Sequence, residues 1–364
     1  MNVEDLKWLA SIFDMSAVDP GAKTIVLVGN GEAPGVTAYY EGLNTGAMRS
    51  SAAIDILKSD GSPLAVKGTV LLGMLGLLAP DATIKLGRTD TTLMLRGPNT
   101  RTPLRLEGNP QIPHVFQRQE NISGTARLSK AEVAPKLAVL AEATAKRMDN
   151  MVLTGVHVAA AKSKRVLALS ATDLVRAAKT SVACTIEGEF TPVILPLADF
   201  NAALALMSDE FELMVGDGIV HLRSGDGMTL VRLNVFNGEF PSLDMLPRKS
   251  TYPHQMAYPA SAFATVQRAC ALVDAGGNLV RVEIKKGRMT LSTQNTEIGS
   301  FEIDAGSTLG PAELDHVMYV DSTYLNIVSR LGDAPVLRFF PDPKKTILFE
   351  GGGIFYWMQP TAMR

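Results

Sequence analysis

The sequence predicts an α+β protein built from six similar units of about 60 residues each. Six stretches carry apolar residues at i, i+3 or i+4, and i+7, which places them on one face of a helix. Their first residues are separated by 64, 63, 67, 63 and 61 residues, and a fixed period indicates one structural unit used repeatedly. The six stretches are Leu6–Leu9–Phe13, Val70–Met74–Leu77, Val133–Leu137–Leu140, Phe200–Leu204–Met207, Phe263–Val266–Cys270 and Tyr324–Ile327–Leu331.

Between these helices apolar and polar residues alternate, which is typical of half-buried strands. Pairs such as Asp217-Gly218 and Asp226-Gly227 separate the alternating segments and supply the positive φ of tight hairpins. Each unit is therefore expected to hold one strand, one helix and then about three antiparallel strands. The clearest strand segments are Val152–Ala159, Arg165–Leu169, Phe211–Val215, Ile219–Leu222, Met228–Val235, Val280–Ile284, Val336–Phe340 and Thr346–Glu350.

A single unit cannot bury both its helix stripe and its apolar sheet face, but two units packed together can. Six units therefore predict three pseudo-repeated domains, each with two helices inside and antiparallel sheets outside. The joints are expected near Asn121 and Thr251, because Pro-rich stretches precede both and interrupt the pattern. The expected domains are an N-terminal domain at 1–121, a central domain at 122–250 and a C-terminal domain at 251–364.

Composition restricts the class of protein. The net charge of −2 means that contact with nucleic acid would require a local basic surface. Cys184 and Cys270 lie far apart and are expected to be thiols, which fits a reducing cytoplasm. The acidic, amphipathic N-terminus is unlike a signal peptide, and the apolar run 70–79 is too short to span a bilayer.

Signals of catalysis are weak, so we expect neither an enzyme nor a bound metal or cofactor. The five histidines, at positions 114, 157, 221, 254 and 316, show no metal-ligand spacing. The segment 26–35 resembles a dinucleotide-binding loop but lacks the third glycine spacing, and the residues after it have a strand pattern. A hairpin loop is the expected structure there.

Helix packing predicts how many chains a closed ring would need. Six helices about 9 Å apart and 10 Å thick would leave a central hole of roughly 7 Å. Twelve would leave a hole of roughly 25 Å, which admits a DNA duplex about 20 Å wide. If the helices line a ring, two chains joined head-to-tail around double-stranded DNA are therefore expected.

Two internal strings and the C-terminus carry a family resemblance. Leu153-Thr-Gly-Val is followed by Leu167-Ala-Leu-Ser-Ala-Thr-Asp-Leu-Val-Arg-Ala, and later by Asn237-Gly-Glu-Phe-Pro-Ser-Leu-Asp-Met-Leu-Pro-Arg. The chain ends Tyr356-Trp-Met-Gln-Pro-Thr-Ala-Met-Arg. In order and spacing these strings resemble the bacterial sliding clamps, the beta subunits of DNA polymerase III. The match is good over residues 123–250 and the C-terminus, fair over the rest of the C-terminal domain, and poor over the N-terminal domain.

The resemblance implies the DNA clamp fold: three domains per chain, a dimeric ring and twelve inner helices. It implies a non-catalytic processivity factor in DNA replication, which tethers a DNA polymerase to its template. Partners, including the polymerase and the clamp loader, would insert short peptides into a cleft between the central and C-terminal domains. Carried over by position, that cleft would use Leu153, Thr172, Leu174, Val175, Arg176, Ala177, Pro241, Leu246, Pro247, Lys344, Thr346, Trp357, Met358, Gln359, Pro360 and Thr361.

Several cleft positions depart from the family pattern. Leu174-Val175 replaces glycine-histidine, Ala177 replaces leucine, Gln359 stands where methionine is usual, and Lys344 stands where an apolar residue is usual. We therefore expect weak binding of the common clamp-binding peptide. Such departures fit a divergent clamp, for instance one that is encoded by a phage and serves its own polymerase.

Individual side chains leave alternatives open. Asp173 is expected to cap a turn, Arg176 either to line the cleft or to pair locally, and Trp357 to be either a core residue or a cleft wall. Basic residues expected on polar helix faces are candidates for contacts with phosphate groups, which carry no sequence information. These candidates are Lys136, Lys146, Arg147, Arg268 and Arg330. By analogy, Leu104 and Leu106 would face Ala271 and Leu272 across the dimer interface.

Two other classes of protein remain open: an enzyme whose site is assembled from scattered residues, and a structural or assembly protein built of tandem units. Electron microscopy of the purified protein separates them. We expect a six-lobed ring of about 78 kDa, which is two chains of 39.0 kDa. A monomer with one deep cleft would favour the enzyme, and larger rings or tubes would favour the assembly protein.

Overall fold

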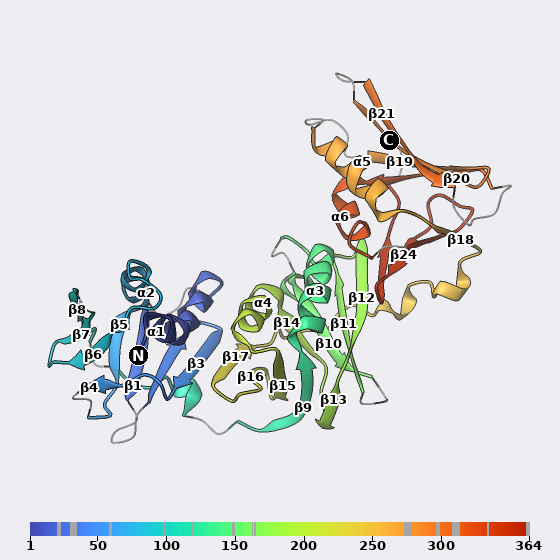
Figure 1. Ribbon diagram of the computed structural model, residues 1–364. Coiled ribbons are helices and arrows are strands. Elements are labelled where there is room, and N and C mark those ends of the chain that lie inside the picture. Colours follow the sequence, from blue (N-terminus) through green and yellow to red (C-terminus); the bar gives the residue numbers. More distant parts are fainter. Residues whose placement is uncertain are drawn as a thin grey trace. The chain divides into compact units, whose positions relative to one another are not determined.

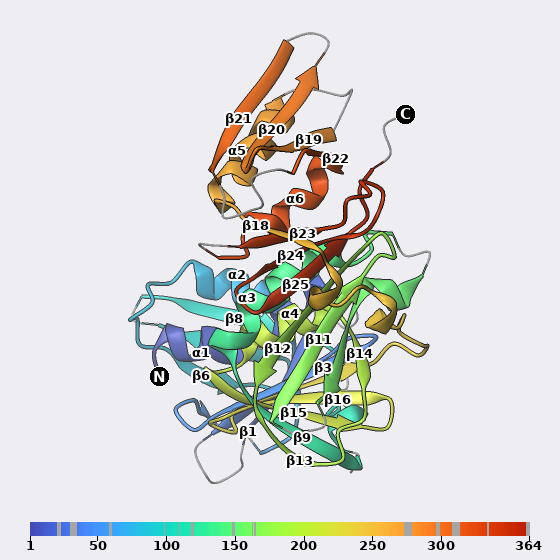
Figure 2. The same ribbon diagram turned by 90° about the vertical axis from the view of Figure 1, so that its right-hand side faces the viewer.

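In the computed structural model (Figures 1 and 2), antiparallel sheets and short helices form two compact units. The structure describes residues 1–19, 23–29, 35–57, 60–97, 99–108, 110–117, 120–147, 150–161, 163, 165–272, 279–295, 299–307, 314–332 and 335–361. Unit 1 comprises residues 1–134, 160–165 and 183–237, and unit 2 comprises residues 135–159, 166–182 and 238–364. Each unit thus takes part of the predicted central domain, and the three-domain division stays a prediction.

Unit 1 is organised around a nine-stranded sheet. Its order is β13 (Thr185–Gly188), β9 (Ile122–Ser129), β15 (Glu210–Gly216), β16 (Ile219–Ser224), β17 (Thr229–Asn234), β3 (Thr45–Ser51), β2 (Val36–Glu41), β1 (Thr24–Gly29) and β5 (Leu64–Lys67). A four-stranded sheet contains β4 (Ile56–Leu57), β6 (Lys85–Arg88), β7 (Thr92–Arg96) and β8 (Arg101–Arg105). The unit also contains α1 (Val3–Ala10), α2 (Gly68–Gly76), α4 (Leu197–Leu206) and β14 (Val193–Pro196). The antiparallel pair of β1 and β2 confirms the hairpin expected in place of a dinucleotide-binding loop.

The pairing of β17 with β3 joins two repeats into one sheet, and Arg49 consolidates this joint. Arg49 is buried, and its guanidinium donates to Thr229 Oγ1 at 2.8 Å and to Leu206 O at 2.7 Å. It also donates to Trp8 O and lies over the Trp8 ring, 4.5 Å from its centroid. Burial lowers the pKa of Arg49 to about 10, so the side chain remains charged at neutral pH.

Unit 2 contains a second extended sheet, in which β10 (Gly155–Ala160), β11 (Val166–Thr172), β12 (Arg176–Ala183), β25 (Ile354–Met358), β24 (Ile347–Gly351), β23 (Val336–Phe339) and β18 (His254–Ala257) follow one another. A four-stranded sheet has the order β21 (Gly299–Ser307), β20 (Arg288–Asn295), β19 (Leu279–Lys285) and β22 (His316–Asp321). Helices α5 (Ala260–Leu272) and α6 (Leu325–Val328) pack against each other. Helix α3 (Lys130–Leu140) begins in unit 1 and ends in unit 2.

All six predicted helical stretches contain helix, but two differ from expectation. On α2 the buried residues are Leu71 and Leu75, whereas Val70 and Leu77 are 46% and 78% exposed. The predicted face is therefore wrong, because a helix that is apolar all round has no periodicity to identify its buried side. The sixth helix, α6, has four residues and follows a 3-10 turn at Ser322–Tyr324.

One strand prediction is also wrong at its start. Residues Met151–Thr154 form a 3-10 turn instead of a strand, and β10 begins only at Gly155. The side chain of Asn150 accepts a hydrogen bond from Val152 N at 3.1 Å, and this cap stabilises the turn. Among the described residues, no helix has the length and apolar character that crossing a membrane requires.

The corrected face of α2 yields a prediction with an internal control. Leu71→Ala should lower the free energy of unfolding by about 2–5 kcal/mol, because it removes a fully buried side chain. Leu77→Ala, in the exposed position at the end of the same helix, should change it by less than about 0.5 kcal/mol. Urea denaturation of both variants measures the difference, and equal effects would contradict this assignment of the buried face.

Candidate functional site

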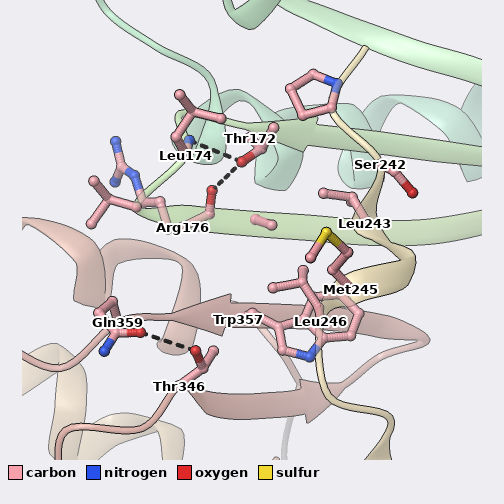
Figure 3. A pocket seen from close by; sticks show the side chains of 13 residues that line it. Thr172, Leu174, Arg176, Ser242, Leu243, Met245, Leu246, Thr346, Trp357 and Gln359 are labelled. Atoms are coloured by element: carbon pink, nitrogen blue, oxygen red, sulfur yellow. Dashed lines mark hydrogen bonds between the residues drawn. The ribbon is translucent and has the colours of Figure 1, made fainter.

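A hollow of about 320 Å³, here named the apolar cleft, opens in unit 2. Three segments of the chain form it: the hairpin between β11 and β12, residues 241–246, and the ends of β24 and β25 (Figure 3). Its lining residues are Thr172, Leu174, Val175, Arg176, Ala177, Pro241, Ser242, Leu243, Met245, Leu246, Thr346, Trp357 and Gln359. Arg176 is the one charged residue in this lining.

Strand pairing brings these distant segments together. Strand β12 is antiparallel to β25, so that Ala177 lies opposite Trp357 and Arg176 opposite Met358. Strand β25 in turn pairs with β24, which places Leu348 opposite Trp357. The backbone ladder therefore fixes the lateral position of the cleft walls before any side-chain contact is made.

The hairpin between β11 and β12 is held by two polar side chains. Asp173 Oδ1 accepts hydrogen bonds from Val175 N at 3.1 Å and from Arg176 N at 2.9 Å. Thr172 Oγ1 donates to Arg176 O at 2.7 Å and accepts from Leu174 N at 3.0 Å. These bonds confirm the prediction that Asp173 caps a turn.

This turn forces Leu174 into an unfavourable backbone conformation. Its φ is +74°, in the left-handed region that costs a residue with a Cβ about 1 kcal/mol. The family pattern has glycine here, so this chain retains the backbone geometry while adding a large side chain. That side chain is 69% exposed and lies at the cleft (Figure 3).

Arg176 is held tightly from its own unit. Its guanidinium Nε lies 2.8 Å from Asp173 Oδ2, and its Cζ lies 4.5 Å from the centroid of the Tyr324 ring. Burial acts to lower the pKa of Arg176, but the hydrogen bond to Asp173 and the neighbouring Tyr356 raise it overall, so the side chain stays charged. Arg176 thus both pairs locally and lines the cleft.

Trp357 is likewise both a core residue and a cleft wall. It forms a buried cluster with Ala177, Tyr252 and Leu348, against which Leu243 packs. Its indole Nε1 donates to Pro247 O at 3.1 Å, which fixes the ring orientation. The base of the cleft is therefore rigid and apolar.

The opposite wall is polar and already hydrogen-bonded. Gln359 Oε1 accepts from Thr346 Oγ1 at 3.0 Å, and Gln359 Nε2 donates to Lys344 O. A methionine at this position could adapt to different ligands, whereas this amide is held in place by its two partners.

Large apolar side chains are exposed at the cleft. Val175 is 48% exposed and Met245 is 92% exposed, in addition to Leu174. Exposed apolar groups of this kind, next to a preformed apolar base, are typical of a site for another protein segment. The lining offers no nucleophile–base pair and no carboxylate, so its chemistry is that of binding.

Ten of the sixteen residues predicted for the cleft line this hollow. The other six lie elsewhere: Leu153 and Met358 are buried, Pro247 and Lys344 contribute carbonyl groups to the contacts above, Thr361 N donates to Tyr319 O at 2.8 Å, and Pro360 is buried. Sequence reasoning missed Ser242, Leu243 and Met245. The 3-10 turn at Leu243–Met245, capped by Ser242 Oγ, turns these residues toward the hollow, and no strand or helix period reveals such a turn.

The predicted basic candidates all lie in unit 2. Lys146 and Arg147 are exposed in a bend after α3, so the prediction that they lie on a helix face is wrong. Arg268 is exposed on α5. Arg330 Nη1 lies 4.0 Å from Glu142 Oε1, and Lys136 Nζ donates to Ser181 O at 2.8 Å.

The residues predicted for the dimer interface differ in exposure. Leu104 is buried within unit 1, Leu106 is half-buried and Ala271 is exposed, while the side chain of Leu272 lies outside the described part of the chain. Their role at an interface stays a prediction.

No family model and no curated protein matches this chain. Solved structures do. The DNA polymerase sliding clamp of Pseudomonas aeruginosa matches with a TM-score of 0.83 and 16% identity, covering 100% of this chain and 99% of that one. The DNA polymerase III beta subunit of Thermotoga maritima gives the same four values. The Helicobacter pylori beta clamp bound to a DNA ligase peptide matches with a TM-score of 0.81 and 16% identity, covering 99% and 98%.

The chain therefore has the fold of the DNA sliding clamps. Within that class, the similar structures are bacterial, and the fold is that of the beta subunit of DNA polymerase III.

The left-handed backbone at Leu174 generates a stability prediction. Leu174→Gly should raise the free energy of unfolding by about 0.5–1 kcal/mol, because glycine adopts positive φ without the Cβ clash and the exposed side chain contributes little packing. Val175→Gly, one residue further along, should lower it. Thermal and urea denaturation measure both, and a destabilised Leu174→Gly variant would contradict the strain.

Proposed function

We propose that this chain is a DNA sliding clamp, a non-catalytic processivity factor of the DNA polymerase III beta type. Two chains joined head-to-tail encircle duplex DNA in the cytoplasm and tether a replicative polymerase to it. The apolar cleft receives short peptide segments of the polymerase and of the clamp loader. The observation that carries the proposal is this cleft, with its exposed apolar side chains, on a chain of the clamp fold.

Two features support peptide binding at the cleft. First, the H. pylori clamp, a structure of the same fold, binds a DNA ligase peptide. Second, the cleft is preformed, because strand pairing and the Trp357–Pro247 hydrogen bond position its walls without a ligand. A preformed site loses little conformational entropy when a peptide binds.

The departures at the cleft favour a peptide preference different from that of the usual clamps. Leu174 adds apolar surface to the rim, while Gln359 presents a fixed amide where adaptable methionine is usual. A partner specific to this chain is therefore the better fit, as expected for a divergent clamp that serves its own polymerase.

For DNA, the proposal relies on local charge, because the whole chain carries a net charge of −2. Lys146, Arg147 and Arg268 are exposed, and all three belong to unit 2. Contacts from such residues to phosphate groups tolerate any sequence, which sliding requires.

DNA association should therefore weaken steeply as salt rises. In fluorescence anisotropy with a 30-base-pair duplex, the triple variant Lys146→Ala/Arg147→Ala/Arg268→Ala should bind more weakly and with a shallower salt dependence, by about two to three units of slope. Lys85→Ala/Lys285→Ala, which removes two exposed lysines from β6 and β19, is the matched control. A flat salt response of the unaltered protein would contradict the proposed DNA contact.

A further inference from the structure

A second hollow of about 320 Å³, here named the lysine hollow, lies beside the apolar cleft in unit 2. Its lining residues are Ala168, Lys179, Thr180, Ser181, Lys249, Gly353, Phe355 and Trp357. Trp357 lines both hollows, so the two are separated by a single indole ring.

Strand register places the two hollows along one face of the sheet. Ala177 lies opposite Trp357, and Lys179 lies opposite Phe355. Because alternate residues of a strand point to the same face, Ala177 and Lys179 share a face with Trp357 and Phe355. Moving from the apolar cleft to the lysine hollow is therefore a displacement along β12 and β25.

One wall of the lysine hollow is aromatic. The rings of Phe355 and Trp357 are stacked with their centroids 6.0 Å apart. Lys249 Nζ lies 5.8 Å from the centroid of the Phe355 ring, so the ammonium group and the aromatic surface are adjacent. Such a combination accommodates a flat apolar group next to an anion.

The charge of the lysine hollow is positive. Its lining contains two lysines and no carboxylate. Lys249 is exposed and pairs at 3.4 Å with Glu350, which also pairs with Arg338. Lys179 is exposed, and no ion pair among the described residues includes it. Burial and the charge of Lys179 lower the pKa of the neighbouring His157, which therefore stays neutral at neutral pH.

We infer that the lysine hollow binds an acidic, aromatic-bearing extension of the same partner peptide that occupies the apolar cleft. The inference rests on the proposed function. Two residues along a strand span about 7 Å, so an extension of about two to four residues crosses Trp357 and reaches Lys179 and Lys249. The partner's aromatic side chain packs on Phe355, and its carboxylate lies between the two ammonium groups.

Continuity with the apolar cleft favours a peptide over single-stranded nucleic acid. Nucleic-acid grooves combine aromatic platforms with a basic track that follows many phosphates. Here the two lysines flank one small hollow, and the neighbouring surface at Leu174 and Met245 is apolar. Binding of single-stranded DNA is nonetheless a distinguishable outcome of the test.

The test starts from a phage-displayed library of random dodecapeptides selected on the intact protein. The most enriched sequence is synthesised with a fluorescent label, both complete and truncated to its apolar anchor. Kd values are measured by anisotropy for the unaltered protein, for Lys179→Ala/Lys249→Ala, and for the control Lys85→Ala/Lys285→Ala. Thermal midpoints establish that all variants are folded.

We expect enriched sequences to carry an apolar anchor followed, within about two to four residues, by an aromatic and an acidic residue. The complete peptide should bind about tenfold more tightly than the truncated one, and Lys179→Ala/Lys249→Ala should abolish that advantage while the control retains it. The truncated peptide should bind all three proteins equally.

Other outcomes overturn specific claims. Equal affinities of complete and truncated peptides, or enriched sequences without acidic residues, would overturn the inference and leave the apolar cleft intact. Selected peptides whose binding is unaffected by Leu174→Asp would overturn the proposed function. Tight binding of a twelve-residue oligothymidylate that depends on Lys179 and Lys249 would replace the peptide by nucleic acid.

Discussion

The functional surface of this chain depends on the antiparallel pairing of β12 with β25. This ladder joins strands from two different repeats into one sheet, and the register of Ala177 opposite Trp357 sets the base of the apolar cleft. A one-residue slip would turn the entire outer face of β25 inward and exchange Trp357 for Tyr356 or Met358. The same device, with β17 and β3 and the buried Arg49, joins two repeats in unit 1.

Backbone geometry at the hairpin explains a departure that sequence alone leaves ambiguous. The turn at Asp173 demands a positive φ at position 174, for which glycine is the unstrained choice. Leucine there costs stability and exposes an apolar side chain to water. Because neither effect stabilises the fold, the side chain is best explained by what it contacts when a partner is bound.

The sequence predicted the repeat because burial of one helix face leaves a period that survives divergence. It did so for α3, α4 and α5, whose predicted apolar residues are buried. It failed for α2, where leucines on every side removed the period, and at Met151–Thr154, where a local cap overrode the strand pattern. At the cleft, the family strings supplied the strand residues, but Leu243 and Met245 lie on a 3-10 turn that follows no period.

Trp357 shows why the two hollows should be separated by substitutions at their rims. The ring belongs to the buried cluster with Tyr252 and Leu348, lines both hollows, and donates a hydrogen bond to Pro247. Removing it would cost about 3–5 kcal/mol of stability and alter both surfaces together, so a loss of binding would not identify either. Leu174 on one side and Lys179 on the other are exposed, and each can change without disturbing the shared core.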